Sequence, residues 1–166
     1  MHAAGAVLSA CGKYRYELMR GWPSILHANE KHVVWVMLNP STADANTNDP
    51  TIRRCIQFSA DWGYSSLLVV NLFAYRATDP DVLLKDPIVD YVGPNNDRSI
   101  VKAIEGAAMV VAAWSGHPAV RARGKQVLQL LQDYLVDLRV LGFTLSGHPR
   151  HPLYVSKETE PTPWRV

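Results

Sequence analysis

The sequence predicts an α/β protein, a three-layer α/β/α sandwich with a mainly parallel central sheet and an antiparallel edge strand. The first observation is a set of four apolar runs without alternating polar residues, which is typical of strands buried on both faces of a parallel sheet. These runs are residues 33–38, 67–73, 109–114 and 138–145. The second observation is that helical signals fill the intervals between the runs, as in successive βα units.

An edge strand is predicted ahead of the first apolar run. Over residues 14–18, Tyr14, Tyr16 and Leu18 alternate with Arg15 and Glu17. This alternation is typical of a half-exposed strand, because successive side chains point to opposite faces. We expect this strand to be an antiparallel neighbour of residues 33–38.

Three helices are expected between the apolar runs. Asp49 and Pro50 suit an N-cap and a first helical position, and Gly63 suits the end of that helix. Its sheet-facing stripe is Ile52, Cys55, Ile56 and Ser59. A second helix is predicted from Asn95 or Asn96 to Glu105. A third covers about residues 120–135, with the buried face Val127, Leu128, Leu131, Tyr134 and Leu135.

Length and composition restrict the class of protein. The 166 residues predict a single domain, 1–166, in which residues 1–12 are loosely ordered. The 48% of hydrophobic residues excludes intrinsic disorder, and two cysteines exclude a disulfide scaffold. The short apolar stretch near the start has no Lys or Arg before it, which argues against a secretory signal, and we expect a cytoplasmic protein. The net charge of +2 is too small to indicate nucleic-acid binding by bulk charge, so any anion site must be local.

The polar loop over residues 39–49 is the first candidate binding segment. It follows an apolar run and leads into a predicted helix N-terminus, where free backbone N–H groups bind anions. Ser41 and Thr42 are therefore candidate phosphate-binding residues. Arg53 and Arg54 lie where the helix dipole disfavours cations. They either bind an anionic ligand or pair with carboxylates, and the candidate carboxylates are Asp44, Asp49 and Asp61.

The second candidate segment is the end of the apolar run 67–73. Asn71 is an amide within this run, and a buried amide must find hydrogen-bond partners. It either satisfies neighbouring backbone or presents a donor and an acceptor to a ligand, as side chains that read nucleobases do. Phe73 and Tyr75 are candidate stacking residues for such a base.

The third candidate segment, residues 147–154, follows the last apolar run. His148 and His151 are each followed by proline, and Arg150 lies between them. An imidazole can donate a hydrogen bond to developing charge or act as an acid or base, while Arg150 suits a phosphate. No cofactor or metal is expected, because no set of Cys, His, Asp or Glu has the spacing of a metal site.

Long motifs resemble a family of bacterial and phage proteins that is a domain of unknown function. The motifs run from MLNPSTAD through NDPTIRRC, WG and NLFAYRATDP to GPNND, AAW and the HPLY of residues 151–154. The resemblance covers nearly the whole chain, from Tyr14 to about Trp164, but it implies no activity.

The layout also resembles, more distantly, the uracil-DNA glycosylase superfamily, which has an α/β/α fold with motifs at strand ends. The resemblance implies that Asn39 positions a water molecule and Asn71 reads the base. It implies that His148 or His151 donates to a base oxygen. The chain departs from this pattern: Ser41 stands where the superfamily has Gly, and the His-Pro steps are not followed by Ser.

These features predict a nucleobase- or nucleic-acid-processing protein, a DNA glycosylase-like N-glycosidic hydrolase acting on a flipped or single-stranded base. The candidate catalytic residues are Asn39, Asp44, His148 and His151. The alternative is a non-catalytic module that binds a nucleotide or nucleic acid, and a third reading is an interaction domain whose polar loops only cap helices. The expected partner is nucleic acid or a nucleotide, with no membrane. The functional readings require the three candidate segments to meet at one cavity.

Overall fold

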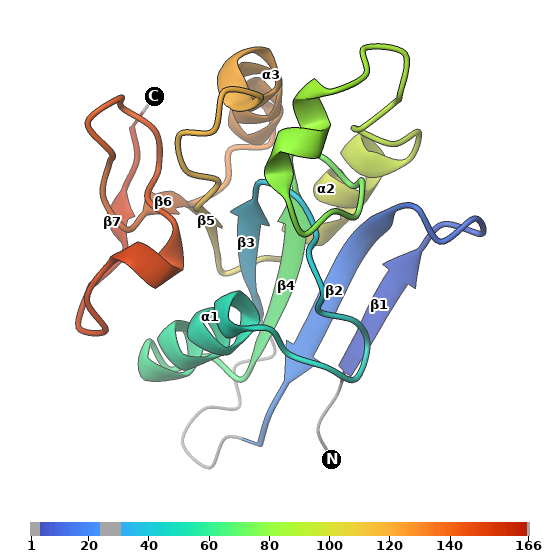
Figure 1. Ribbon diagram of the computed structural model, residues 1–166. Helices are drawn as coiled ribbons and strands as arrows, with labels where there is room; N and C mark the ends of the chain where they lie inside the picture. Colours follow the sequence, from blue (N-terminus) through green and yellow to red (C-terminus); the bar gives the residue numbers. More distant parts are fainter. Residues whose placement is uncertain (1–3, 24–30, 166) are drawn as a thin grey trace.

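The structure, a computed structural model, describes residues 4–23 and 31–165, and its centre is a mixed sheet. The seven strands are β1 (Ala4–Leu8), β2 (Arg15–Gly21), β3 (Val33–Met37), β4 (Ser66–Asn71), β5 (Met109–Ala112), β6 (Leu138–Val140) and β7 (Thr162–Pro163). Their order is β1-β2-β4-β3-β5-β6-β7 (Figure 1). The central strands β4, β3, β5 and β6 are parallel, and the outer pairings are antiparallel. The predicted α/β class is confirmed.

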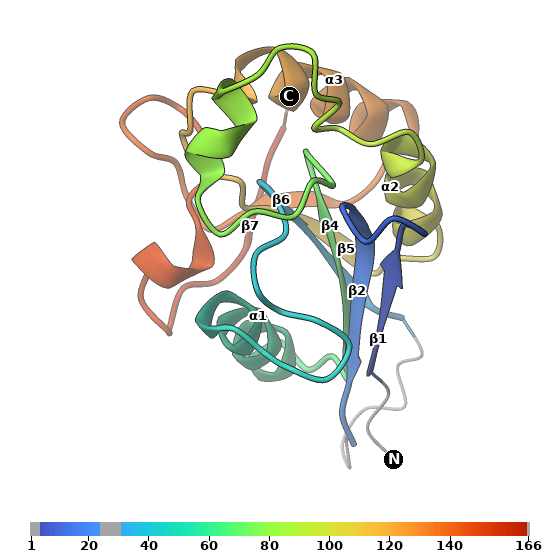
Figure 2. The same cartoon turned by 45° about the vertical axis from the view of Figure 1, so that its right-hand side comes forward.

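Helices cover both faces of the sheet. In Figure 2, α1 (Pro50–Asp61) lies on one side, while α2 (Asn96–Ile104) and α3 (Val120–Asp133) lie on the other. Two short 3₁₀ helices, η1 (Pro80–Leu84) and η2 (Pro152–Tyr154), follow β4 and β6. The strand order changes direction around β3, because α1 leads from β3 to β4 on one side while β5 lies on the other. Such a point, at the carboxyl ends of the strands, is where open α/β sheets bind ligands.

The helix α1 begins and packs as the sequence predicts. Asp49 is its N-cap and accepts a hydrogen bond from the Ile52 N–H at 2.8 Å, and Pro50 is the first helical residue. The predicted stripe is buried at Ile52, Cys55 and Ser59 and packs on β3, where Trp35 donates to the Ser59 hydroxyl at 3.0 Å. Local capping and helical periodicity are therefore sufficient to define this helix.

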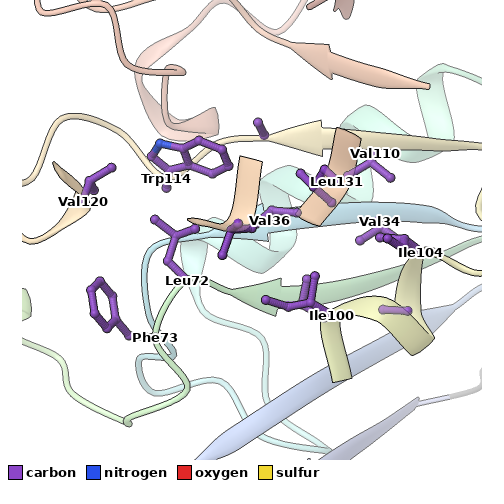
Figure 3. Packing of buried hydrophobic residues seen from close by; sticks show 14 of the residues in the cluster. Val34, Val36, Leu72, Phe73, Ile100, Ile104, Val110, Trp114, Val120 and Leu131 are labelled. Carbon is purple, nitrogen blue, oxygen red and sulfur yellow. The ribbon is translucent and has the colours of Figure 1, made fainter. Parts of the chain in front are cut away.

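The opposite face holds the larger part of the core. Side chains of β3, β4 and β5 that alternate with those facing α1 pack here against α2 and α3 (Figure 3). The residues at the centre are Val34, Val36, Leu72, Ile100, Val110 and Leu131. Because these strands bury side chains on both faces, their sequences have no polar alternation, except at their carboxyl ends.

The edge of the sheet differs from the prediction. The strand β2 pairs with β4, where Leu18 lies opposite Val69, and not with residues 33–38. The reason is that β3 is already hydrogen-bonded on both sides, to β4 and β5. Residues 4–8, predicted to be loosely ordered, form the edge strand β1, while residues 1–3 lie outside the described part of the chain.

The helix α3 and the strand β6 end earlier than predicted. The helix α3 ends at Asp133, so Tyr134 and Leu135 lie at the surface, and Leu135 is 92% exposed in a left-handed conformation with φ of 51°. The strand β6 ends at Val140, because the chain turns at Gly142, whose φ is 104°. None of the helices in residues 4–23 and 31–165 is long and apolar enough to cross a membrane.

We predict that Gly93→Ala lowers the free energy of unfolding by more than the roughly 1–2 kcal/mol expected for a left-handed alanine. Gly93 has φ of 89°, and an added Cβ would lie 2.9 Å from Tyr14 Cδ1 and 3.2 Å from Tyr16 Cε1. Urea denaturation measures the change. The matched control is Gly106→Ala, because Gly106 has φ of 74° but no atom within 4 Å of an added Cβ. Equal losses in the two variants would contradict the close packing at Gly93.

Candidate functional site

A cavity of about 330 Å³ lies at the carboxyl ends of β3, β4 and β5, on the face that α1 covers. Its volume is within the range of about 300–1,000 Å³ for small-molecule sites. Its polar lining comes from remote parts of the chain: Arg15, Asn39, Ser41, Asp49, Thr51, Asn71, Thr78, Ser115, His151 and Tyr154. The three candidate segments therefore meet at one cavity.

Asn71 lines this cavity from the last position of β4. The alternation of the strand places Leu67 and Val69 against α1, so Asn71 lies on that same face, beside the first turn of the helix. Asn71 is 1% exposed, and its side-chain Nδ2 has no hydrogen-bond partner among the described residues. A buried amide donor without a partner is costly, so this amide is suited to a ligand that brings an acceptor.

Side chains from α2 and α3 hold the backbone at Asn71. The buried Asn96 donates from Nδ2 to the Asn71 and Leu72 carbonyls at 2.9 and 3.0 Å, and Arg123 donates to the Leu72 carbonyl at 2.8 Å. Arg123 also forms an ion pair with Asp97. Through Asn96 and Asp97, the GPNND motif therefore helps to position the end of β4.

Asn39 connects the loops that follow β3 and β4. Its Nδ2 donates to the Ala77 carbonyl at 2.8 Å and to the Pro40 carbonyl at 3.1 Å, while the Ala77 N–H donates to the Pro40 carbonyl at 2.9 Å. The amide nitrogen of Asn39 is therefore used within the protein. Its Oδ1 accepts no hydrogen bond from the described residues.

Two arginines of β2 hold the loop that leads from Asn39 to α1. Arg15 donates to the Ala43 carbonyl, and Arg20 donates to Asn48 Oδ1 at 2.7 Å and to the Asp44 carbonyl. Burial lowers the pKa of Arg15 to about 10, and the charge of Asp49 opposes the shift, so Arg15 is still a cation at neutral pH. Arg15 is 2% exposed and lines the cavity, which therefore has a fixed positive charge in its wall.

The carboxylate that lines the cavity is Asp49 and not Asp44. Asp49 lies at the N-terminus of α1, beside Thr51 and close to the wall formed by Arg15. The Asp44 side chain instead accepts hydrogen bonds from the Asn46 and Thr47 N–H groups, both at 2.8 Å, and these bonds lower the Asp44 pKa. Asp44 thus stabilises the turn and lies outside the cavity lining.

His151 is the histidine that lines the cavity. Its Nδ1 accepts a hydrogen bond from the Leu153 N–H at 3.3 Å, which assigns the ring proton to Nε2. Burial lowers the His151 pKa, although the charge of Asp49 opposes the shift, so the ring is neutral at pH 7 and has an Nε2–H donor. His148 lies at a different cavity, beside Trp114 and Val120.

The three candidate phosphate-binding arginines lie outside the cavity lining. Arg54 donates to the Val155 and Pro152 carbonyls at 2.9 and 3.3 Å and lies over the Phe58 ring, so it connects α1 to the segment that carries His151. Arg53 donates to the Asn48 carbonyl at 2.6 Å, and Arg150 donates to the Phe143 carbonyl at 2.9 Å. None of the three pairs with a carboxylate among the described residues.

The remaining candidate binding residues lie at different places in the structure. Phe73 is buried in the core on the α2 and α3 face. Tyr75 packs edge-on against Tyr91, with ring centroids 5.2 Å apart, and with Thr42 it lines a neighbouring cavity. Ser41 lines both cavities.

Sequence reasoning missed several residues that line the cavity at the carboxyl ends of β3, β4 and β5, namely Arg15, Thr51, Ser115 and Tyr154, and it considered Asp49 only as a helix cap or as an ion-pair partner of an arginine. The sequence did contain a signal that Asp49 could line the site. Asp49 caps the helix that follows a parallel strand, and such N-caps lie at the carboxyl-end edge of the sheet, where ligands bind. No local signal marks Ser115, which has a left-handed φ of 63° and donates from its N–H to the Pro149 carbonyl at 2.9 Å.

The site combines planar amides, a neutral imidazole donor, a carboxylate and a buried cation. Amide and imidazole groups suit the donors and acceptors at the edge of a planar heterocycle. No group of three His, Cys, Asp or Glu residues that could hold a metal ion occurs in the described ranges.

Fold and site together define an α/β protein with a polar, ligand-sized cavity at the carboxyl ends of its parallel strands. Residues 15–153 match the family described as protein of unknown function (DUF1643). The chain belongs to this family, in agreement with the expectation of a domain of unknown function. Comparison with curated proteins and with solved structures gave no match.

We predict that Arg54→Lys destabilises the protein by about 1–3 kcal/mol, because lysine cannot donate to two carbonyls in the planar geometry of arginine. Urea denaturation measures the loss. Arg53→Lys is the matched control, since Arg53 is the exposed neighbour and donates to the Asn48 carbonyl in the loop before α1. A loss in Arg53→Lys as large as in Arg54→Lys would argue against a specific tether.

We predict that the free energy of unfolding falls as the pH drops below 6.5, the ordinary His pKa, towards the lowered pKa of His151. In this range the unfolded state binds the His151 proton and the folded state does not. Above this range His151 contributes no pH dependence. His151→Gln should reduce the decline, whereas His148→Gln should retain it. Denaturation curves between pH 5 and 8 provide the measurement, and an unchanged decline in His151→Gln would refute the assignment.

Proposed function

We propose that the protein binds a nucleobase in the cavity at the carboxyl ends of β3, β4 and β5 and hydrolyses the N-glycosidic bond of a flipped or single-stranded nucleotide. The observation that carries the proposal is the convergence of Asn39, Asn71 and His151 at one cavity. Asn71 is the last residue of β4, while Asn39 follows β3 and His151 follows β6, so their meeting is not a consequence of local sequence. The distant resemblance to uracil-DNA glycosylases is consistent with these roles.

Asn71 is the residue proposed to read the base. Its buried Nδ2 has no partner among the described residues, and a base that offers an acceptor removes that cost, about 1–3 kcal/mol. The amide plane also matches the edge of a nucleobase, which presents adjacent donors and acceptors. Asn96 and Arg123 keep the strand end in place, so the amide is preorganised.

His151 is proposed to stabilise the leaving base. When the bond between C1′ and the base nitrogen breaks, its electron pair stays on the base, and negative charge develops on the ring and its oxygen. A neutral imidazole with an Nε2–H can donate to that oxygen, and the hydrogen bond to the Leu153 N–H holds this tautomer. One such donor is worth roughly 3–4 kcal/mol of transition-state stabilisation.

Asp49 and Asn39 are proposed to position the attacking water. The water oxygen bonds to C1′, one of its protons passes to the Asp49 carboxylate, and that proton is finally taken up by the released base. The Oδ1 of Asn39 accepts the water's second hydrogen in a hydrogen bond. Asp49 replaces Asp44 in this role, because Asp49 lines the cavity and Asp44 does not.

A non-catalytic binding module is the second candidate, and one observation favours it. Asn39 donates its amide nitrogen to two backbone carbonyls, and Asp49 accepts the capping N–H of Ile52. Both water-positioning groups therefore have structural tasks that explain their presence without catalysis. Binding of a base without its release would identify this function.

We predict that the protein releases a free base from one or more single-stranded oligonucleotides containing uracil, mismatched or modified bases, as measured by strand cleavage at the abasic product. Asn71→Ala and His151→Gln should each reduce release about 10²–10³-fold. Asp49→Asn should do likewise while preserving the helix cap, because Asn caps as well as Asp.

His148→Gln is the control for this experiment, because His148 lies at another cavity and release should be unchanged. Failure of the wild-type protein to release or bind any of these bases would overturn the proposal. Binding without release would support the non-catalytic module.

A further inference from the structure

A second cavity, of about 530 Å³, lies beside the first. The two share Ser41, Ala77 and Thr78 in their linings, so they are adjacent. The other residues that line the second cavity are Gly12, Lys13, Thr42, Tyr75 and Arg76. The site proposed above does not use this cavity.

Three segments build the second cavity. The turn between β1 and β2 carries Lys13, and the loop after β4 carries Arg76, whose N–H donates to the Lys13 carbonyl at 2.9 Å. Arg76 also donates from Nη1 to the Gly12 carbonyl at 3.3 Å. The loop after β3 adds Ser41 and Thr42, and it is joined to the same region by the hydrogen bond between Ala77 and Pro40. The cavity walls are thus held by backbone contacts.

The second cavity is positively charged. Its lining contains two cations, Lys13 and Arg76, and no carboxylate. Neither cation forms a salt bridge with another described residue, and the Arg76 Nε is buried without a hydrogen-bond partner there. The buried cation Arg15, in the wall of the first cavity, adds to the charge on this side.

We propose that the second cavity is a phosphate subsite for the ligand whose base occupies the first cavity. This inference rests on the proposed function, and it assigns the phosphate to Lys13 and Arg76 instead of the arginines of α1. A phosphate accepts hydrogen bonds from guanidinium, ammonium and hydroxyl groups, and the lining offers all three. The ligand class is therefore a phosphorylated nucleoside, free or within an oligonucleotide.

The test compares nucleosides with their 5′- and 3′-monophosphates by calorimetric titration of the full chain. We expect at least one monophosphate to bind about tenfold or more tightly than its nucleoside, as for one charge-assisted hydrogen bond. Arg76→Gln and Lys13→Gln should each remove most of this gain and leave nucleoside affinity unchanged. Arg53→Gln is the matched control and should retain the gain, because Arg53 lines neither cavity.

A second experiment distinguishes a free mononucleotide from an oligonucleotide as the phosphorylated ligand. Short single-stranded oligonucleotides should show an affinity that falls steeply with salt if several phosphates are bound, whereas a mononucleotide site gives a shallow dependence. Either outcome supports the subsite, provided that Arg76→Gln weakens binding of the phosphorylated ligand. Equal affinities of nucleoside and monophosphates, unchanged in both variants, would overturn the subsite and leave the base site intact.

A third arm separates failure of the subsite from failure of the proposed function. If no nucleoside binds, titration with inorganic phosphate followed by ³¹P NMR still examines the second cavity. Phosphate binding that is lost in Arg76→Gln and kept in Arg53→Gln supports the subsite, although the base site would be refuted. Identical behaviour of all proteins would overturn the subsite. If Arg76→Gln does not fold, Lys13→Gln, whose side chain is exposed, provides the same comparison.

Discussion

The polar backbone where β3 and β4 leave the sheet depends on hydrogen bonds from remote side chains, and the rest of the site depends on this constraint. Asn39 donates to a carbonyl of the loop after β4, and Asn96 and Arg123 donate to carbonyls at the end of β4. Arg15 and Arg20 donate to carbonyls of the loop before α1. Buried carbonyls without partners would destabilise the fold. Two of these side chains, Arg15 and Asn39, also line the cavity, so fold stability and site geometry depend in part on the same residues.

Charge is distributed unevenly around the two adjacent cavities. The first combines the Arg15 cation with the Asp49 carboxylate and a neutral His151, whereas the charged residues that line the second, Lys13 and Arg76, are both cations. A ligand with a neutral, hydrogen-bonding ring at one end and an anion at the other matches this distribution. The distinction arises because the Asp49 carboxylate lines only the first cavity, whereas Lys13 and Arg76 line only the second.

Features that depend on a few neighbouring residues were predicted correctly from the sequence, whereas contacts between remote segments were not. The N-cap and Pro50 defined the start of α1, and the polar Asn71 in an apolar run indicated the end of a strand, where Asn71 lines the first cavity. The partner of β2 was predicted incorrectly, since pairing depends on which strand edges are already occupied. The short strands β1 and β7 were not foreseen, because two to five residues carry too little pattern. Arg54 occupies an unfavourable helix position because its long side chain reaches two carbonyls of a remote segment.

By itself, the sequence determined the α/β class, the three helices and the family, because capping, periodicity and motifs act over a few residues. Only the tertiary structure decided which polar residues share a cavity. His151 lines it and His148 does not, and Asp49 lines it in place of Asp44, although each pair lies close together in the chain. The physical reason is that strand order and contacts between remote segments decide which side chains line the cavity. The residues adjacent in sequence do not reveal either of these.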